Sequence, residues 1–204
     1  MDISINELLT VFITFFTVID PIGTIPVFIA VTNGFENSHK KRIARKAAFV
    51  AAGVLTFFVL AGEIILNAIK VPLYSFQIAG GIVLFLFALT MIFGESKPDE
   101  EIGKIGKQDD KAIFPLAMPS LASPGAILAC ILLTKNDENS FLEQTSTWLM
   151  MIAVIAIAWT FMLFASKINQ LIGSGGAAIV SRVMGLILTA VAVEYVLDGL
   201  KYIL

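Results

Sequence analysis

The sequence predicts an all-α polytopic membrane protein whose six transmembrane helices form two inverted three-helix repeats. Three observations carry this prediction. Hydrophobic residues make up 57% of the 204 residues and charged residues only 15%, against about 25% in an ordinary soluble domain. Six apolar segments are each long enough to cross a bilayer, which takes about 20 residues. The first and the fourth of these segments carry proline and glycine inside them.

The first three spans are predicted at 8–31, 43–69 and 71–93. Asp20-Pro21-Ile22-Gly23 interrupts the first span, because proline removes a backbone donor and clashes with the preceding helical turn. Ten of the seventeen residues in 95–111 are charged, which is typical of a solvated linker. We therefore expect a first three-helix repeat over 1–97 and a charged cytoplasmic linker over 98–111.

The second repeat is predicted over 112–204, with spans at 112–134, 148–172 and 177–204. Ser123-Pro124-Gly125 interrupts the fourth span. A polar loop over 135–147 precedes the fifth span, and the glycine-rich turn 173–176 precedes the sixth.

The two halves are similar to each other. Placing Gly125 on Gly23 requires a shift of 102 residues, and placing Gly185 on Gly80 requires a shift of 105. Two similar shifts from separate segments indicate a duplication. Because three spans is an odd number, the second copy would cross the membrane in the opposite direction, which is a recurrent plan of secondary transporters.

Lysine and arginine predict the orientation of the chain. Eleven of the fourteen lie in or near the loops that follow the first, third and fifth spans. Positive residues concentrate in cytoplasmic loops. We therefore expect those loops to be cytoplasmic and both termini to lie on the extracytoplasmic side.

Each break leaves backbone groups without helical partners, and these groups are the candidate binding site at the membrane midplane. The amides at the start of each second half-helix, at Gly23-Thr24 and Gly125-Ala126, suit a carboxylate. The carbonyls freed before each break suit an ammonium group. The alternative is two proline kinks without a ligand. The expected substrate-binding residues are Asp20, Pro21, Gly23, Thr24, Ser123, Pro124, Gly125 and Ala126.

Asp20 has two interpretations. A carboxylate in the middle of a span costs about 2.5–3.5 kcal/mol to insert, which favours a substrate or proton site. Alternatively, Asp20 caps the half-helix that begins at Pro21. Four further residues are candidates for lining the pocket or for coupling: Thr17, Gln77, Arg182 and Glu194.

The last two of these candidates are charged. Arg182 either pairs with Asp20 or a substrate carboxylate, or extends to the cytoplasmic interface. Glu194 lies deeper in its span than Glu63 does, and it is therefore the better candidate for proton coupling.

Other function classes are not indicated by the sequence. The chain has one histidine, His39, and one cysteine, Cys130, so we expect neither a metal site nor a catalytic set, and hence no enzyme. No cofactor is expected, although coupling to protons or another ion stays open. The net charge of −2 does not indicate nucleic-acid binding. The expected partners are the lipid bilayer and a small-molecule substrate; the oligomeric state is left open.

Several segments resemble the MarC family of bacterial and archaeal membrane proteins. The run from Phe15 to Pro26, FFTVIDPIGTIP, resembles the first-span signature of the family. Similar motifs are PLAMP at Pro115 with SPGA at Ser123, FQIAGG at Phe76 and RVMG at Arg182. The resemblance covers nearly the whole chain. One departure is Ser123, where the family pattern has glycine, so a side chain would narrow the cavity or add a hydroxyl there.

The resemblance implies a secondary carrier of the SnatA (NAAT) type in the inner membrane. Such a carrier moves small neutral amino acids, such as glycine and alanine, by alternating access. The main alternative is a channel or exporter for another small solute, including the drug-resistance role that the family name suggests. A third possibility is a membrane component without a transport role.

Overall fold

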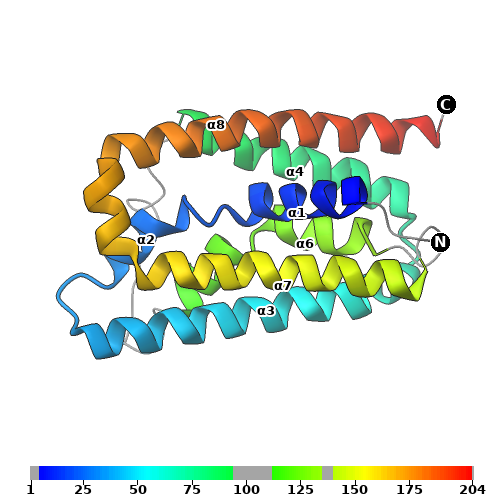
Figure 1. The fold of residues 1–204 in the computed structure, drawn as a ribbon. Coiled ribbons are helices and arrows are strands. Elements are labelled where there is room, and N and C mark those ends of the chain that lie inside the picture. The colour runs from blue at the N-terminus through cyan, green and yellow to red at the C-terminus, as the bar shows by residue number, and fades with distance from the viewer. Residues whose placement is uncertain (1–4, 94–111, 135–139, 204) are drawn as a thin grey trace.

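The computed structural model describes residues 5–93, 112–134 and 140–203, and within these ranges the chain is helical and contains no strand (Figure 1). In chain order the elements are α1 (Ile5–Ile19), α2 (Thr24–Val31), α3 (Asn37–Ala68), α4 (Leu73–Phe93), η2 (Ile113–Leu121), α6 (Pro124–Leu132), α7 (Phe141–Leu163) and α8 (Ala165–Lys201). The predicted linker over 98–111 lies outside the described residues.

Up to six segments can cross a membrane by length and composition. Five are apolar over at least 18 residues, with α1 and α2 taken together as Ile5–Val31. The sixth is the pair η2 and α6, which is bent by 48° at its break. The prediction of an all-helical chain is therefore confirmed for the described residues, with five or six candidate spans against the six predicted.

Several element boundaries differ from the prediction, and α7, for example, ends at Leu163 rather than at 172. Helix α3 begins at Asn37 rather than at 43, because lysine and arginine favour helix and continue it beyond the apolar segment. Helix α7 begins at Phe141 rather than at 148, because Ser140 and Glu143 form a capping box at its start. The predicted turn 173–176 is a single kink inside α8, where Gly173 has a φ of +71°.

The two interrupted segments lie at the centre of the bundle. Figure 1 shows α1 and α6 between two flanking pairs, α4 with α8 on one side and α3 with α7 on the other. Half of the apolar stretch of α1–α2 is buried within the protein, against 22–33% for the four long single helices. The start of α1 and the end of α8 lie at the same end of the bundle (Figure 1).

Small residues bring α4 and α8 into backbone contact. A Cβ atom added to Gly81 would lie 2.9 Å from the carbonyl oxygen of Ala192. A Cβ atom added to Gly185 would lie 3.1 Å from the carbonyl oxygen of Ala88. Such close approach is the main source of cohesion between helices in lipid, where burial from water gives no driving force.

Candidate functional site

The first break is built around Asp20. Helix α1 ends at Ile19, and Asp20 has a φ of +50°, a conformation that aspartate tolerates better than most residues. The Asp20 Oδ1 atom accepts a hydrogen bond from the Gly23 amide at 2.9 Å. The Asp20 carbonyl accepts from the Thr24 amide and the Thr24 hydroxyl, each at 3.1 Å. Asp20 therefore caps the turn over 21–23 that leads into α2, whose own N-cap position is Gly23.

Gly23 is required by this geometry. A Cβ atom added there would collide with the Asp20 carboxylate. The glycine thus lets the carboxylate reach the Gly23 amide in a largely buried segment; Asp20 itself is 1% exposed.

The second break has a different local construction. In η2 the backbone is extended at Phe114 and Met118, each of which precedes a proline that disfavours helix at that position. Helix α6 then begins at Pro124, with Ser123 as its N-cap. The Ser123 hydroxyl oxygen accepts from the Ala126 amide at 3.1 Å.

The two breaks contact each other directly. The Ser123 hydroxyl donates to the Val18 carbonyl in the last turn of α1 at 2.7 Å. The Thr24 and Ser120 hydroxyl oxygens lie 3.2 Å apart. Each of these side chains is 0–2% exposed. We call the group Asp20, Thr24, Ser120 and Ser123 the junction of the two breaks.

Side chains of the junction hydrogen-bond to backbone groups that the sequence analysis expects to be open for a substrate. The Gly23 amide is held by Asp20, and the Ala126 amide by Ser123. The Val18 carbonyl, one of those freed before the first break, is held by Ser123 as well. In this conformation these two amides and this carbonyl are therefore not open, because side chains of the protein itself bond them, as burial in an apolar bundle demands.

Seven of the eight predicted binding residues are buried, and Pro124 is exposed. Helix α4 closes one side, since a Cβ atom added to Gly125 would collide with Leu84. Gln77 is buried on the same helix at 6% exposure. Thr17 is also buried, and its hydroxyl donates to the Ile13 carbonyl within α1.

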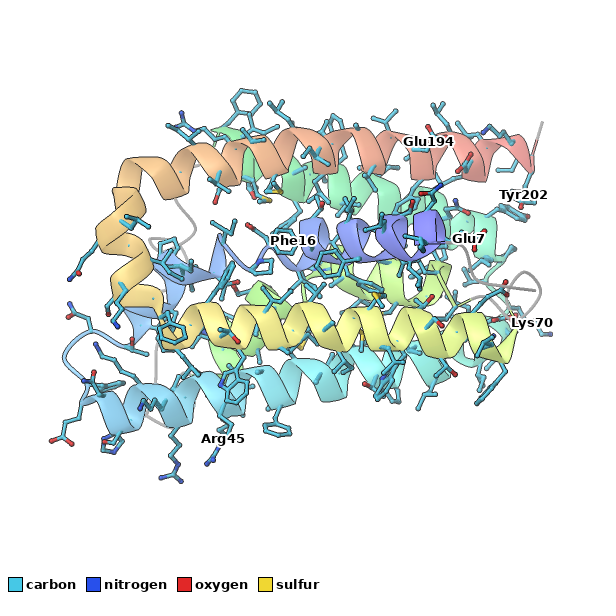
Figure 2. All side chains as sticks on the ribbon, viewed as in Figure 1. Glu7, Phe16, Arg45, Lys70, Glu194 and Tyr202 are labelled. Atoms are coloured by element: carbon cyan, nitrogen blue, oxygen red, sulfur yellow. The ribbon has the colours of Figure 1, made fainter. Side chains whose placement is uncertain are left out.

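Arg182 and Glu194 are not part of the junction. Both side chains are exposed on α8, and Figure 2 shows Glu194 at the periphery of the bundle. Their assignment to the pocket lining is not supported by this placement, because the helical rotation of α8 turns both positions away from the core. Sequence reasoning missed Ser120; the signal for it is the Pro119-Ser120 pair inside the interrupted span.

Comparisons with known proteins show similarity to integral membrane proteins. A family model described as "MarC family integral membrane protein" matches residues 5–204. A UPF0056 membrane protein of Methanocaldococcus jannaschii is 34% identical over 193 residues, which cover 93% of this chain and 94% of that protein. The UPF0056 membrane protein YvbG of Bacillus subtilis is 30% identical over 196 residues, covering 94% and 92%. No solved structure matches the chain.

Proposed function

Because the chain belongs to the MarC family of integral membrane proteins, we propose that it is a secondary transporter for small neutral amino acids of the glycine and alanine class. The relatives are named only as membrane proteins, so the substrate class comes from the sequence motifs and from the junction. The observation that carries the proposal is the buried junction, in which the side chains of two broken helices hold the backbone amides and the carbonyl that the two ends of a zwitterion would take over.

An inverted repeat is supported by the packing of α4 on α8. Gly81 lies against Ala192, and Gly185 lies against Ala88. Adding 104 to Gly81 and Ala88 gives Gly185 and Ala192, so the second contact is the first one with the two helices exchanged. A two-fold axis between equivalent helices produces this reciprocity. The shift of 104 is also close to the shifts of 102 and 105 found in the sequence.

The junction supports the same symmetry. A shift of 102 relates Val18 to Ser120 and Gly23 to Gly125. Thr24, next to Gly23, contacts Ser120. A Cβ atom added to Gly125 would correspondingly lie 3.6 Å from Val18. We therefore propose that the two halves move against each other about this axis, with the breaks at the membrane midplane.

Substrate binding would exchange one set of partners for another. A substrate carboxylate can replace Asp20 or Ser123 at the Gly23 and Ala126 amides, and an ammonium group can replace Ser123 at the Val18 carbonyl. Separating the breaks removes two hydrogen bonds, each worth about 0.5–1.5 kcal/mol net. This cost is small enough for an open state to be populated as a minor conformation.

The closed junction favours a carrier over a channel. Its polar side chains are 0–2% exposed, and alternating access requires one state in which the path is closed in this way. A carrier of this kind needs no cofactor or catalytic residue, and we propose none. Asp20, which lies at the junction, becomes the candidate for proton or other ion coupling in place of Glu194.

We further propose that the protein lies in the inner membrane with both termini on the extracytoplasmic side. The start of α1 and the end of α8 share one end of the bundle (Figure 1). Figure 2 shows Lys70 near that end and Arg45, in the basic first part of α3, toward the other. The positive-inside rule then assigns the Arg45 end to the cytoplasm.

Uptake into proteoliposomes tests the function. Radiolabelled glycine and alanine should enter protein-containing vesicles with saturable kinetics, and unlabelled substrate inside should accelerate entry. Gly125→Leu should abolish uptake, because bulk there meets Leu84 and Val18. Gly53→Leu is the matched control, since a side chain at Gly53 meets no atom within 4 Å. Uptake no greater than in empty vesicles under every imposed gradient would refute the proposal, and unsaturable flux would establish a pore.

A further inference from the structure

A cavity of about 270 Å³ lies where α2, α3, α7 and α8 meet. It is at the turn at which α7 ends at Leu163 and α8 begins at Ala165. Its polar rim contains Asn37, Lys40 and Lys41 from the first turns of α3, and Ser166 and Lys167 from the first turn of α8. The cavity is separate from the junction of the two breaks.

The rim is strongly cationic. Three lysines from two helices surround the cavity, and none of its lining residues is acidic. Within the described part of the chain, the structure shows no ion pair that involves Lys40, Lys41 or Lys167. Like charges held around one small cavity repel each other unless an anion lies between them.

The start of α3 adds to this positive potential. Among the described residues no side chain caps α3, so its first amides keep their hydrogen-bonding capacity at the positive end of the helix dipole. Asn37, the first residue of α3, lines the cavity. Glu36 is the N-cap residue of this 32-residue helix but does not line this cavity, so the three lysine side chains are the main source of positive potential here.

The remainder of the cavity is apolar. Phe28 and Met162 form a buried wall, at 3% and 1% exposure. Leu163 and Phe164 flank the opening and are 37% and 51% exposed, and the Lys167 ammonium lies 6.0 Å from the centre of the Phe164 ring. A cationic rim beside an apolar wall suits a ligand with a negative head and a hydrocarbon tail.

We propose that this cavity binds the headgroup of an anionic phospholipid. The phosphate lies among Lys40, Lys41 and Lys167, and an acyl chain lies along Leu163 and Phe164 into the surrounding bilayer. Basic pockets between membrane helices bind anionic headgroups in this way. Phe28 belongs to α2, so the bound lipid contacts the half-helix that follows the first break. The proposal requires a multi-pass membrane protein and does not depend on the transport function.

A second cavity, of about 340 Å³, is less suited to an anion. It is also lined by His39, Arg42 and Lys46, but Glu36 lies among them. An acid in the lining offsets part of the positive charge and repels a phosphate. The cavity at the α7–α8 turn is therefore the better anion site of the two.

Lipid binding to the purified full-length protein tests the proposal. Native mass spectrometry would compare phosphatidylglycerol with phosphatidylcholine of the same acyl chains, for the unaltered protein and for Lys40→Gln, Lys41→Gln, Lys167→Gln and Arg45→Gln. Arg45 is the matched control because it carries the same charge on α3, lines neither cavity and points away from the bundle (Figure 2).

We expect the unaltered protein to retain phosphatidylglycerol in preference to phosphatidylcholine. Each lysine substitution should weaken phosphatidylglycerol binding roughly fivefold, because a basic residue near an anionic surface contributes about 1 kcal/mol. Arg45→Gln should leave binding unchanged, and Lys167→Arg should restore it. Equal retention of the two lipids, or an equal loss in Arg45→Gln, would overturn the proposal. Displacement of the lipid by millimolar inorganic phosphate would also overturn it, by showing a site for free phosphate.

Discussion

Replacing Ser123 by alanine removes two hydrogen bonds with different roles. The hydroxyl oxygen caps α6 by accepting from the Ala126 amide, and the hydroxyl proton is donated to the Val18 carbonyl of the other broken helix. Ser123 is completely buried and Val18 is 1% exposed, so water cannot replace either bond without a rearrangement. The substitution therefore tests whether the contact between the two breaks stabilises the structure.

The two losses can be estimated separately. Loss of a serine N-cap costs about 1 kcal/mol. A buried carbonyl left without a donor, here that of Val18, costs about 1–3 kcal/mol. Ser123→Ala should therefore destabilise the protein by about 2–4 kcal/mol. For a chain of this length, 1 kcal/mol shifts Tm by roughly 2–4 °C, so the expected decrease is about 4–16 °C.

Thermal unfolding in detergent, followed by tryptophan fluorescence, measures the decrease in Tm. Ser140→Ala is the matched control, because Ser140 also caps a helix through its hydroxyl oxygen but makes no bond to another break. That control should lose only about 2–4 °C. Ser123→Gly retains a tolerable N-cap, so its decrease in Tm should come only from the Val18 carbonyl that has lost its donor. Equal shifts for Ser123→Ala and Ser140→Ala would refute the reasoning.

Three further predictions concern the first break and the bundle. Gly23→Ala should destabilise the protein by about 1–3 kcal/mol through overpacking against the Asp20 carboxylate, and should lower both Tm and glycine uptake. Gly53→Ala should change neither Tm nor uptake. Equal changes in the two variants would contradict the collision at Gly23. Asp20→Asn should preserve the hydrogen bond from the Gly23 amide, whereas Asp20→Ala should destabilise the protein by about 1–2 kcal/mol. The decrease in Tm should therefore be smaller for Asp20→Asn. Equal decreases in Tm would argue against a cap. Trp148→Phe should cost about 0.5–1.5 kcal/mol, because the Trp148 Nε1 atom donates to the Thr56 hydroxyl oxygen across α3 and α7 at 2.9 Å. A double-mutant cycle with Thr56→Val measures that bond, and strictly additive Tm changes would show that it contributes nothing.

The positions of the breaks could be predicted because their causes are local. Pro21 cannot donate a backbone hydrogen bond, and Pro124 is best tolerated in the first turn of a helix, wherever the rest of the chain lies. The capping role of Asp20 follows from the same local chemistry, since its acceptor and the Gly23 donor are three residues apart. The Ser123 hydroxyl lies at the second break, as the sequence indicates, but its partner Val18 could not be named from the sequence.

The contacts between the breaks could not be predicted, because they join residues far apart in the chain. Ser123 and Val18 are separated by 105 positions, and Thr24 and Ser120 by 96. Neither the carbonyl of Val18 nor the hydroxyl of Ser120 has a local sequence signal that marks it as a partner. The predicted start of α7 at 148 is also wrong, because the polar residues after Ser140 belong to the helix and not to a loop.

The sequence by itself predicted a membrane protein with six spans, two of them broken, and the structure has five or six candidate spans. Bilayer thickness and proline chemistry act on each segment separately, so composition and position suffice for both conclusions. Only the tertiary structure decided which faces of the helices meet. Spans that are apolar all round have no polar face to distinguish the inside from the lipid. Helix packing therefore placed Glu194 outside, buried Asp20 and closed the two breaks on each other.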